Sequence, residues 1–173
     1  MNNIKLKIQK LHKDAIIPTR STETSIGIDL YALEDTIIRP GETIRIKTGI
    51  AIQPDPPNVY SLVVNRTSMA IKGLQVLSTI VEQDFRGHVI VCMMNTNISL
   101  VLSYLATRYT FPDQNIIKKV NQLLIDSTIT IKQGDKIAQL LLHNILNCDI
   151  EHIDLLDYTE KGYKHCNPKN LLI

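Results

Sequence analysis

Polar residues suited to phosphate chemistry stand in four short segments separated by apolar runs. The second segment, residues 65–73, places Arg66 beside the hydroxyls of Thr67 and Ser68, directly after a strand-like run. A guanidinium offers a fixed fork of donors to phosphate oxygens, and hydroxyls and backbone N–H groups can complete the anion site. If residues 67–71 form a helical turn, its start adds a favourable dipole for an anion. The alternative interpretation is a helix N-cap without a ligand.

The other three segments supply carboxylates and an amide. Asp29 follows a glycine in a strand, either as a functional carboxylate or as a turn aspartate at a bulge. Glu82 and Asp84 lie near the ring of Phe85 and a tight turn. Gln139 is polar within an otherwise apolar strand, where a buried amide needs a phosphate oxygen or a backbone carbonyl as partner.

The elements around these segments are mostly short strands. Turn signals recur about every 8 to 12 residues, a pattern typical of a β-sandwich or barrel. Residues 54–58, rich in proline, indicate a loop. The expected strands are residues 5–9, 26–33, 35–40, 42–47 continuing into 50–52, 60–64, 88–94, 127–132 and 137–143.

One stretch departs from the strand pattern. Apolar residues between 98 and 126 recur at helical spacing, which predicts a helical insert with Asp113 as the N-cap of its second part. The insert is either an appended helical pair or an element that binds a protein partner. Residues 158–173 show no periodicity and are expected to be a tail. The sequence therefore predicts one domain, residues 1–157, followed by that tail.

Composition excludes several classes of protein. The chain has 173 residues, abundant Ile and Leu for an aliphatic core, and a net charge of +2, too small to indicate nucleic-acid binding. It contains no apolar run long enough for a membrane span and no signal-peptide pattern, so a cytoplasmic location is expected, or the host cytoplasm or nucleus if the source is viral. The cysteines are expected to be free thiols. Irregular spacing argues against a metal site built from His143, Cys148, His152, His165 and Cys166.

Taken in order, the four segments resemble the motifs of the trimeric dUTPase family. Residues 27–32 resemble Ala-Gly-Tyr-Asp-Leu, and residues 65–73 resemble Pro-Arg-Ser-Ser/Gly-Leu-Ala. The third segment is similar to Gly-Val-Ile-Asp-x-Asp-Tyr-Arg-Gly, and the fourth to Gly-Asp-Arg-Ile-Ala-Gln-Leu. The resemblance covers residues 4–97 and 127–143. It implies an all-β, distorted jelly-roll barrel that forms a homotrimer with active sites shared between subunits.

The resemblance also implies an activity, which is hydrolysis of dUTP to dUMP and pyrophosphate. Water would attack the α-phosphate in line, with Mg²⁺ carried by the triphosphate rather than by protein ligands. Glu82 would act as general base, and Phe85, where the family has tyrosine, would lie under the deoxyribose. Asp29 would organise the site through water or through Arg66. The phosphate-binding set would be Arg66, Thr67, Ser68 and Gln139.

Three departures from the family pattern leave an alternative open. Glu82 stands where the family has aspartate, residues 98–126 are inserted, and the Gly-rich C-terminal arm is missing, so that Lys161 and Tyr163 are its only candidate replacements. These changes allow a catalytically weak or inactive protein of the same fold that binds nucleotide or a protein partner. A related deaminase would need Asp-Pro-Gly in the third segment, and a serine hydrolase would need a glycine-flanked nucleophile, and neither is present.

Overall fold

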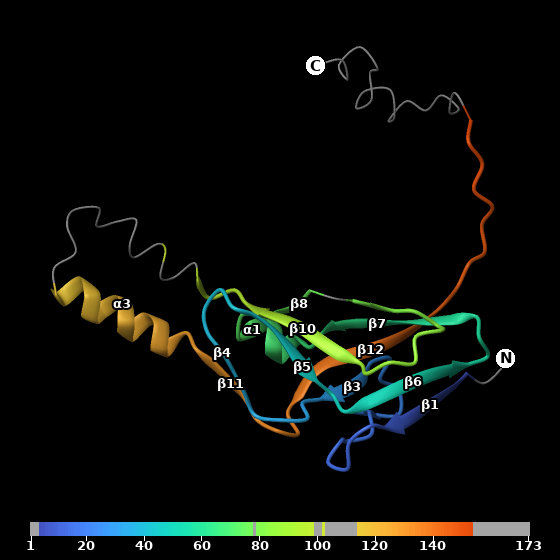
Figure 1. The fold of residues 1–173 in the computed structure, drawn as a ribbon, viewed down its shortest axis with the longest axis horizontal. Coiled ribbons are helices and arrows are strands. Elements are labelled where there is room, and N and C mark those ends of the chain that lie inside the picture. Colours follow the sequence, from blue (N-terminus) through green and yellow to red (C-terminus); the bar gives the residue numbers. More distant parts are fainter. Residues whose placement is uncertain (1–3, 78, 99–101, 103–113, 154–173) are drawn as a thin grey trace.

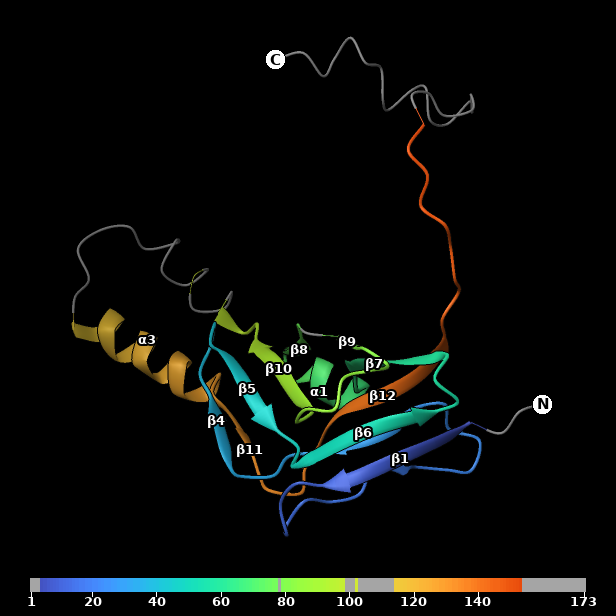
Figure 2. The same cartoon turned by 45° about the vertical axis from the view of Figure 1, so that its right-hand side comes forward.

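The structure is a computed structural model that describes residues 4–77, 79–98, 102 and 114–153. Short strands wrap around a common core, while α3 and the segment after β12 project away from it (Figures 1 and 2). This arrangement confirms the predicted all-β fold with a helical insert. The strands are β1 (Lys5–Lys10), β2 (Thr19–Arg20), β3 (Ile28–Tyr31), β4 (Thr36–Ile38), β5 (Thr43–Lys47), β6 (Ile50–Asp55), β7 (Val59–Asn65), β8 (Leu74–Val76), β9 (Ile80–Val81), β10 (Ile90–Asn95), β11 (Ile129–Ile131) and β12 (Lys136–Asn144).

The strands of the described residues pair antiparallel in several small sheets. The largest has the order β2-β3-β12-β7-β9, and a second has the order β5-β10-β8. β1 pairs with β6, and β11 pairs with β4. The core between them is aliphatic, as expected, and its fully buried members include Leu30, Ile38, Ile46, Leu74, Met93, Ile137 and Leu140. The central strands β12, β7 and β3 therefore form a rigid support for the polar residues at their ends.

The prediction for residues 42–58 was partly wrong. The run from 42 to 52 is two strands in different sheets, because the chain turns at Gly49, whose φ of 75° a glycine adopts without strain. β6 then continues through Pro54 into the expected loop, where Pro54 lies opposite Leu6 of β1. A proline is tolerated there because a two-stranded sheet leaves an edge on which no backbone N–H is needed. The short strands β2, β8 and β9 were not predicted.

The second part of the insert, residues 114–126, is a helix, as predicted. The helix α3 (Gln114–Asp126) is amphipathic and contains no fully buried residue. Buried Asn95, at the end of β10, joins the two ends of the insert to the body. Its side-chain amide donates to the carbonyls of Ile38 in β4 and of Ser127 just after α3, at 3.0 and 2.8 Å. The predicted N-cap Asp113 and the tail, residues 158–173, lie outside the described residues. None of the described helices is long and apolar enough to cross a membrane.

Candidate functional site

A completely buried carboxylate, Asp29 on β3, is surrounded by cationic and hydroxyl groups. Its Oδ1 lies 3.0 Å from Nε of Arg66, in an ion pair without the alignment of a linear hydrogen bond. Its Oδ2 lies 2.8 Å from Nζ of Lys136 and accepts a hydrogen bond of 2.8 Å from the Ser21 hydroxyl. Strands β3 and β12 are neighbours, which brings these residues together from distant parts of the sequence. The predicted link between Asp29 and Arg66 is thus present.

The ionised form of Asp29 is favoured in this cluster. Burial alone would raise the pKa of its carboxyl, but the hydrogen bonds from Lys136 and Ser21 and the charge of Arg66 outweigh it, so the pKa lies below its ordinary value. One carboxylate then faces two cations, and the cluster keeps one net positive charge. That surplus suits a site for phosphate.

Arg66 is placed by both its backbone and its side chain. It is the N-cap of the short helix α1 (Thr67–Ile71), so the predicted helical turn is confirmed. The carbonyl of Arg66 accepts from the N–H groups of Met69 and Ala70, and its Nη1 donates to the Lys136 carbonyl at 3.2 Å. Thr67 and Ser68 are exposed, and no side chain caps the helix, so the N-cap alternative does not account for their hydroxyls.

Gln139 lies on β12, the strand that also carries Lys136, and it is the register partner of Asp29 on β3 and of Val64 on β7. It is half-buried rather than buried. Within the described part of the chain its amide makes no hydrogen bond. A Cβ added to Gly27 would lie 2.7 Å from Cδ and Oε1 of Gln139. Gly27 therefore leaves the space in which the amide rests.

Replacing Gly27 with alanine is expected to displace the Gln139 amide at little cost in stability, since the contact is with the end of a flexible side chain. If Gln139 binds phosphate, we expect KM for the triphosphate that the family resemblance implies to rise about tenfold in Gly27→Ala, because the loss of a hydrogen bond to a charged group typically costs that much. Steady-state kinetics and thermal melting would measure both effects. The Gln139→Ala variant is the control, and an unchanged KM in both variants would exclude Gln139 from the site.

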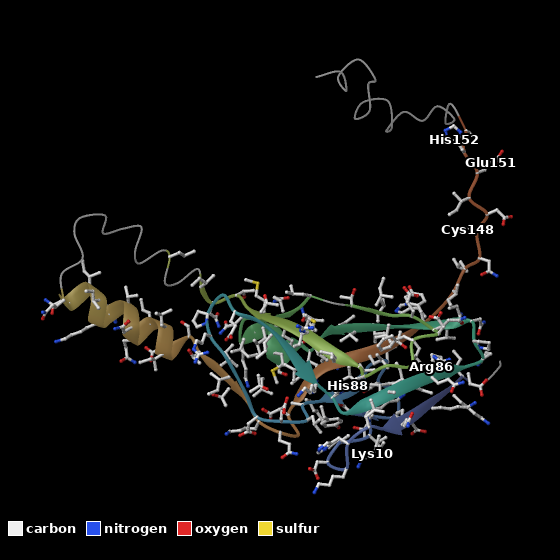
Figure 3. The ribbon with its side chains drawn as sticks, in the orientation of Figure 1. Lys10, Arg86, His88, Cys148, Glu151 and His152 are labelled. Carbon is white, nitrogen blue, oxygen red and sulfur yellow. The ribbon has the colours of Figure 1, made fainter. Side chains whose placement is uncertain are left out.

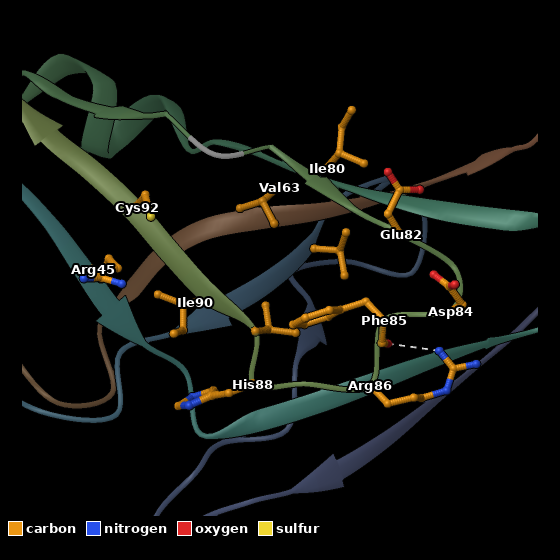
Figure 4. Close-up of a pocket in the computed structure, with 12 residues that line it drawn as sticks. Arg45, Val63, Ile80, Glu82, Asp84, Phe85, Arg86, His88, Ile90 and Cys92 are labelled. Atoms are coloured by element: carbon orange, nitrogen blue, oxygen red, sulfur yellow. Dashed lines mark hydrogen bonds between the residues drawn. The ribbon is translucent and has the colours of Figure 1, made fainter.

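Glu82 and Phe85 line a separate cavity of about 620 Å³ (Figure 4). Glu82 follows β9, and the Phe85 ring lies against Gly87, where an added Cβ would be 2.6 Å from Cζ. Nη1 of Arg86 donates to the carbonyls of Gln83 and Phe85, which holds the turn between the carboxylate and the ring. The other lining residues are Arg45, Val63, Ile80, Val81, Asp84, His88, Val89, Ile90 and Cys92.

His88 anchors this loop to the core. Its Nε2 accepts a hydrogen bond of 2.7 Å from the Gly49 N–H, which requires an unprotonated Nε2. Burial lowers the pKa of His88 and the charge of Lys47 lowers it further, while Glu34 opposes this in part. A pKa below the value of 6.5 for an unfolded chain means that the unfolded state binds more protons at mildly acid pH. The contribution of His88 to stability is thus present above about pH 6.5 and declines below it.

We expect the wild-type protein to lose stability as the pH falls from 7 through 6.5 towards 5, and His88→Gln to lose less. Glutamine offers an acceptor to the Gly49 N–H but does not titrate in this range. Denaturant unfolding at several pH values would measure the difference. His12→Gln, at an exposed position, is the control, and an equal pH dependence in His88→Gln and wild type would contradict this account.

Within a single chain, the cluster around Asp29 and Arg66 is far from the cavity that Glu82 lines. Val81 pairs with Ser61 near the start of β7, whereas Arg66 follows the end of that strand. Five residues of extended chain span about 17 Å. Glu82 lies beyond Val81, so the carboxylate and Arg66 of one chain are too distant to contact the same phosphate.

Two of the predicted site residues and the residues of the disfavoured metal site remain to be placed. Lys161 and Tyr163 lie outside the described residues. Cys148, Glu151 and His152 lie on the segment that leads away from the body, far from His88 and Arg86 (Figure 3). Among the described residues no group of three or more His, Cys, Asp or Glu side chains is arranged to hold a metal ion. Sequence reasoning missed Ser21 and Lys136. Lys136 stands inside the fourth segment, but no local pattern marks Ser21.

Comparison with known proteins shows to which family this chain belongs. A family model described as dUTPase matches residues 13–103, more than half of the chain. A deoxyuridine 5'-triphosphate nucleotidohydrolase of Corynebacterium jeikeium is 30% identical over 159 residues, which cover 90% of this chain and 84% of that protein. The Variola virus enzyme of the same name is 28% identical and covers 84% of this chain and 79% of its own.

Solved structures show the same fold. A variant dUTPase of phage 80alpha superposes with a TM-score of 0.70 at 20% identity, over 93% of this chain and 95% of that one. A dUTPase of S. aureus phage phi11, described with a structural Mg(II) ion, gives a TM-score of 0.68 at 20% identity, over 89% and 99% of the two chains. The fold is thus a dUTPase-type jelly roll. The chain belongs to the dUTPase family.

Proposed function

We propose that the protein hydrolyses dUTP to dUMP and pyrophosphate, using Glu82 as general base and the cluster around Arg66 to hold the phosphates. Family membership supports this dUTP diphosphatase activity and does not favour the inactive alternative. The observation that carries the assignment of residues is the Asp29 cluster, because a buried carboxylate with two cations is costly in a protein that uses it only for packing.

The proposed reaction begins with a water molecule activated by the Glu82 carboxylate. Loss of a proton to Glu82 lets the water attack the α-phosphorus, and pyrophosphate leaves on the opposite side. Arg66, Thr67, Ser68 and Gln139 would hold the phosphate oxygens. The Phe85 ring would lie under the deoxyribose, where the 2′-hydroxyl of a ribonucleotide would collide with it.

Mg²⁺ fits this site as a part of the substrate. Both oxygens of Asp29 are engaged by Arg66, Lys136 and Ser21, so this carboxylate does not serve as a metal ligand. We propose that phosphate oxygens hold the ion, where it would neutralise charge that develops on the triphosphate. The phi11 enzyme is described with a structural Mg(II) ion, which shows that a protein of this fold can hold Mg²⁺ but leaves its catalytic use here as part of the proposal.

The separation of the two groups along β7 supports a homotrimer with shared active sites. A general base must lie within hydrogen-bond reach of the attacking water while phosphate ligands hold the same substrate. With about 17 Å of strand between them in one chain, Glu82 of one subunit would act with Arg66 of another. The described part of the insert has no assigned role in this arrangement, and a protein partner for residues 98–126 stays a prediction, as do phosphate and base contacts by Lys161 and Tyr163.

Pyrophosphate release from dUTP, dTTP, dCTP and UTP would test the function. We expect release from dUTP that requires Mg²⁺ and stops when the ion is chelated. A protein that binds dUTP but releases no pyrophosphate would favour the inactive alternative. Mass measurement in solution would test the trimer, and an active monomer would contradict a shared site.

A further inference from the structure

A side-chain hydrogen bond holds the end of the cavity loop against the turn between β5 and β6. Nε2 of His88 accepts from the Gly49 N–H at 2.7 Å, and His88 lies at the opposite end of this loop from Glu82 (Figure 4). The Val89 N–H then donates to the Ile50 carbonyl at 2.9 Å, which continues the contact through the backbone. Gly49 is buried, and a buried N–H needs an acceptor, which His88 supplies.

Gly49 is a fixed point for this contact. A Cβ added to it would lie 2.7 Å from Cβ of Ala15 and 3.0 Å from Cδ1 of Leu33, so the turn is tightly packed on that side. Its carbonyl accepts from the Leu11 N–H at 2.7 Å. The loop is therefore fastened by His88 to a part of the body that has little room to move.

The loop itself is compact, so its two ends are mechanically connected. The Phe85 N–H donates to the Glu82 carbonyl at 3.1 Å, and Nη1 of Arg86 donates to the Phe85 carbonyl at 3.0 Å. Glu82, Phe85 and His88 all line the same cavity. A shift of the loop at His88 would therefore displace the Glu82 carboxylate as well.

We propose that His88 is a positioning residue for Glu82, and that the loop takes its active geometry only while the imidazole is unprotonated. A protonated imidazole would direct an N–H at the Gly49 N–H, and two donors repel each other. His88 touches neither the attacking water nor the phosphates in this arrangement and acts through the loop. The inference rests on the proposed function, in which Glu82 is the general base.

The charged groups around His88 set the pH range of this effect. Burial is the largest cause that lowers the pKa of His88, Lys47 lowers it further, and Glu34 opposes this in part. Lys47 and Glu34 also pair with each other at 3.2 Å. His88 is therefore unprotonated at neutral pH and is protonated only below its ordinary value of 6.5. The other charged residues that line the cavity are Arg45, Glu82, Asp84 and Arg86.

Two variants test this role through kcat at saturating dUTP and Mg²⁺ between pH 5 and 8. Glutamine at position 88 keeps an acceptor and does not titrate, whereas leucine removes the acceptor at every pH. At pH 7.5 we expect kcat of His88→Gln within about threefold of the wild type and kcat of His88→Leu about tenfold lower, with little change in KM, as for a displaced catalytic group. At pH 5 the ratio of kcat in His88→Gln to that in the wild type should rise about threefold or more.

The matched control is His12→Gln. Nδ1 of His12 also accepts a backbone N–H, that of Asp14 at 3.2 Å, but in an exposed turn outside the cavity. Its ratio of kcat to the wild-type value should stay constant over the pH range. Taking ratios at each pH removes the titration of the substrate, and all rates are measured well below the melting temperature of each protein at that pH. If His88→Leu does not fold, the pH profile of His88→Gln decides the result.

The possible failures are distinguishable. A wild-type protein that releases no pyrophosphate from dUTP at any pH overturns the proposed function and this inference together. A wild-type protein that hydrolyses dUTP, with the same pH profile of kcat as His88→Gln, overturns only the positioning role. His88 would then stabilise the fold without setting the geometry of Glu82.

Discussion

Replacing Glu82 with glutamine is expected to lower kcat for dUTP by about 10³-fold, because a general base typically contributes about 10² to 10⁴ to the rate. Glutamine has nearly the same shape but accepts no proton from water at neutral pH. KM should change little, since Glu82 acts on the water rather than on the ground-state nucleotide. Pyrophosphate release under steady-state conditions measures both constants.

The control for this variant is Asp84→Asn, which neutralises an exposed carboxylate two residues away in the same cavity. We expect it to keep kcat within a few-fold of the wild type. Full activity of Glu82→Gln would exclude Glu82 as the base. An equal loss in both variants would indicate a general effect of charge in the loop instead of proton transfer.

The variant Glu82→Asp tests whether the rate depends on the position of the carboxylate. The loop is closed by Arg86 and anchored by His88, so the position of the carboxylate is set by its side-chain length. A displacement of about 1 Å can reduce a rate by about 10²-fold. If this loop is built for glutamate, the shorter residue will be slower even though it matches the family motif.

Replacing Asp29 with asparagine is expected to have the second-largest effect, on both folding and activity. The change leaves Arg66 and Lys136 without their shared counterion in a partly buried site, which we expect to cost about 3 kcal/mol of stability. Arg66 would also lose its orienting partner, with an expected fall in kcat/KM of about 10²-fold. Denaturant unfolding and steady-state kinetics would measure the two losses.

The stability loss should depend on pH in a defined direction. The pKa of Asp29 is below its ordinary value of 3.8 in the folded protein, so its contribution is present above about pH 4 and is lost as the pH falls through the folded value. The wild type and Asp29→Asn should therefore become more alike in stability below pH 4. The control, Asp35→Asn, breaks an exposed carboxylate–lysine pair of 2.8 Å and should change stability little. Equal effects at the two positions would contradict a special role for the buried cluster.

Much of this architecture follows from local patterns in the sequence. The alternation of residues 42–47 predicts the strand β5, although the turn at Gly49 that separates it from β6 was not predicted. The helical turn considered for residues 67–71 is present as α1. The family resemblance supplied the fold and the link between Asp29 and Arg66. Short strands such as β8 and β9 have too few residues to show a period, so only their pairing with β10 and β7 defines them.

The site was harder to predict than the fold because its contacts join distant residues. Ser21 and Lys136 reach Asp29 through the pairing of β2, β3 and β12, which no local pattern encodes. His88 stands at the end of the cavity loop in the sequence, but its partner Gly49 becomes visible only in three dimensions. The cavity loop, in contrast, is continuous in sequence, and Glu82 and Phe85 were found together.

The length of β7 has a consequence for mixtures of defective subunits. If each active site takes Glu82 from one chain and Arg66 from another, neither Glu82→Gln nor Arg66→Ala trimers contain a complete site. Trimers reassembled from both variants contain junctions at which the intact Glu82 of one chain meets the intact Arg66 of its neighbour. Two inactive proteins should then restore part of each other's activity by complementation, and this rescue would require subunit exchange.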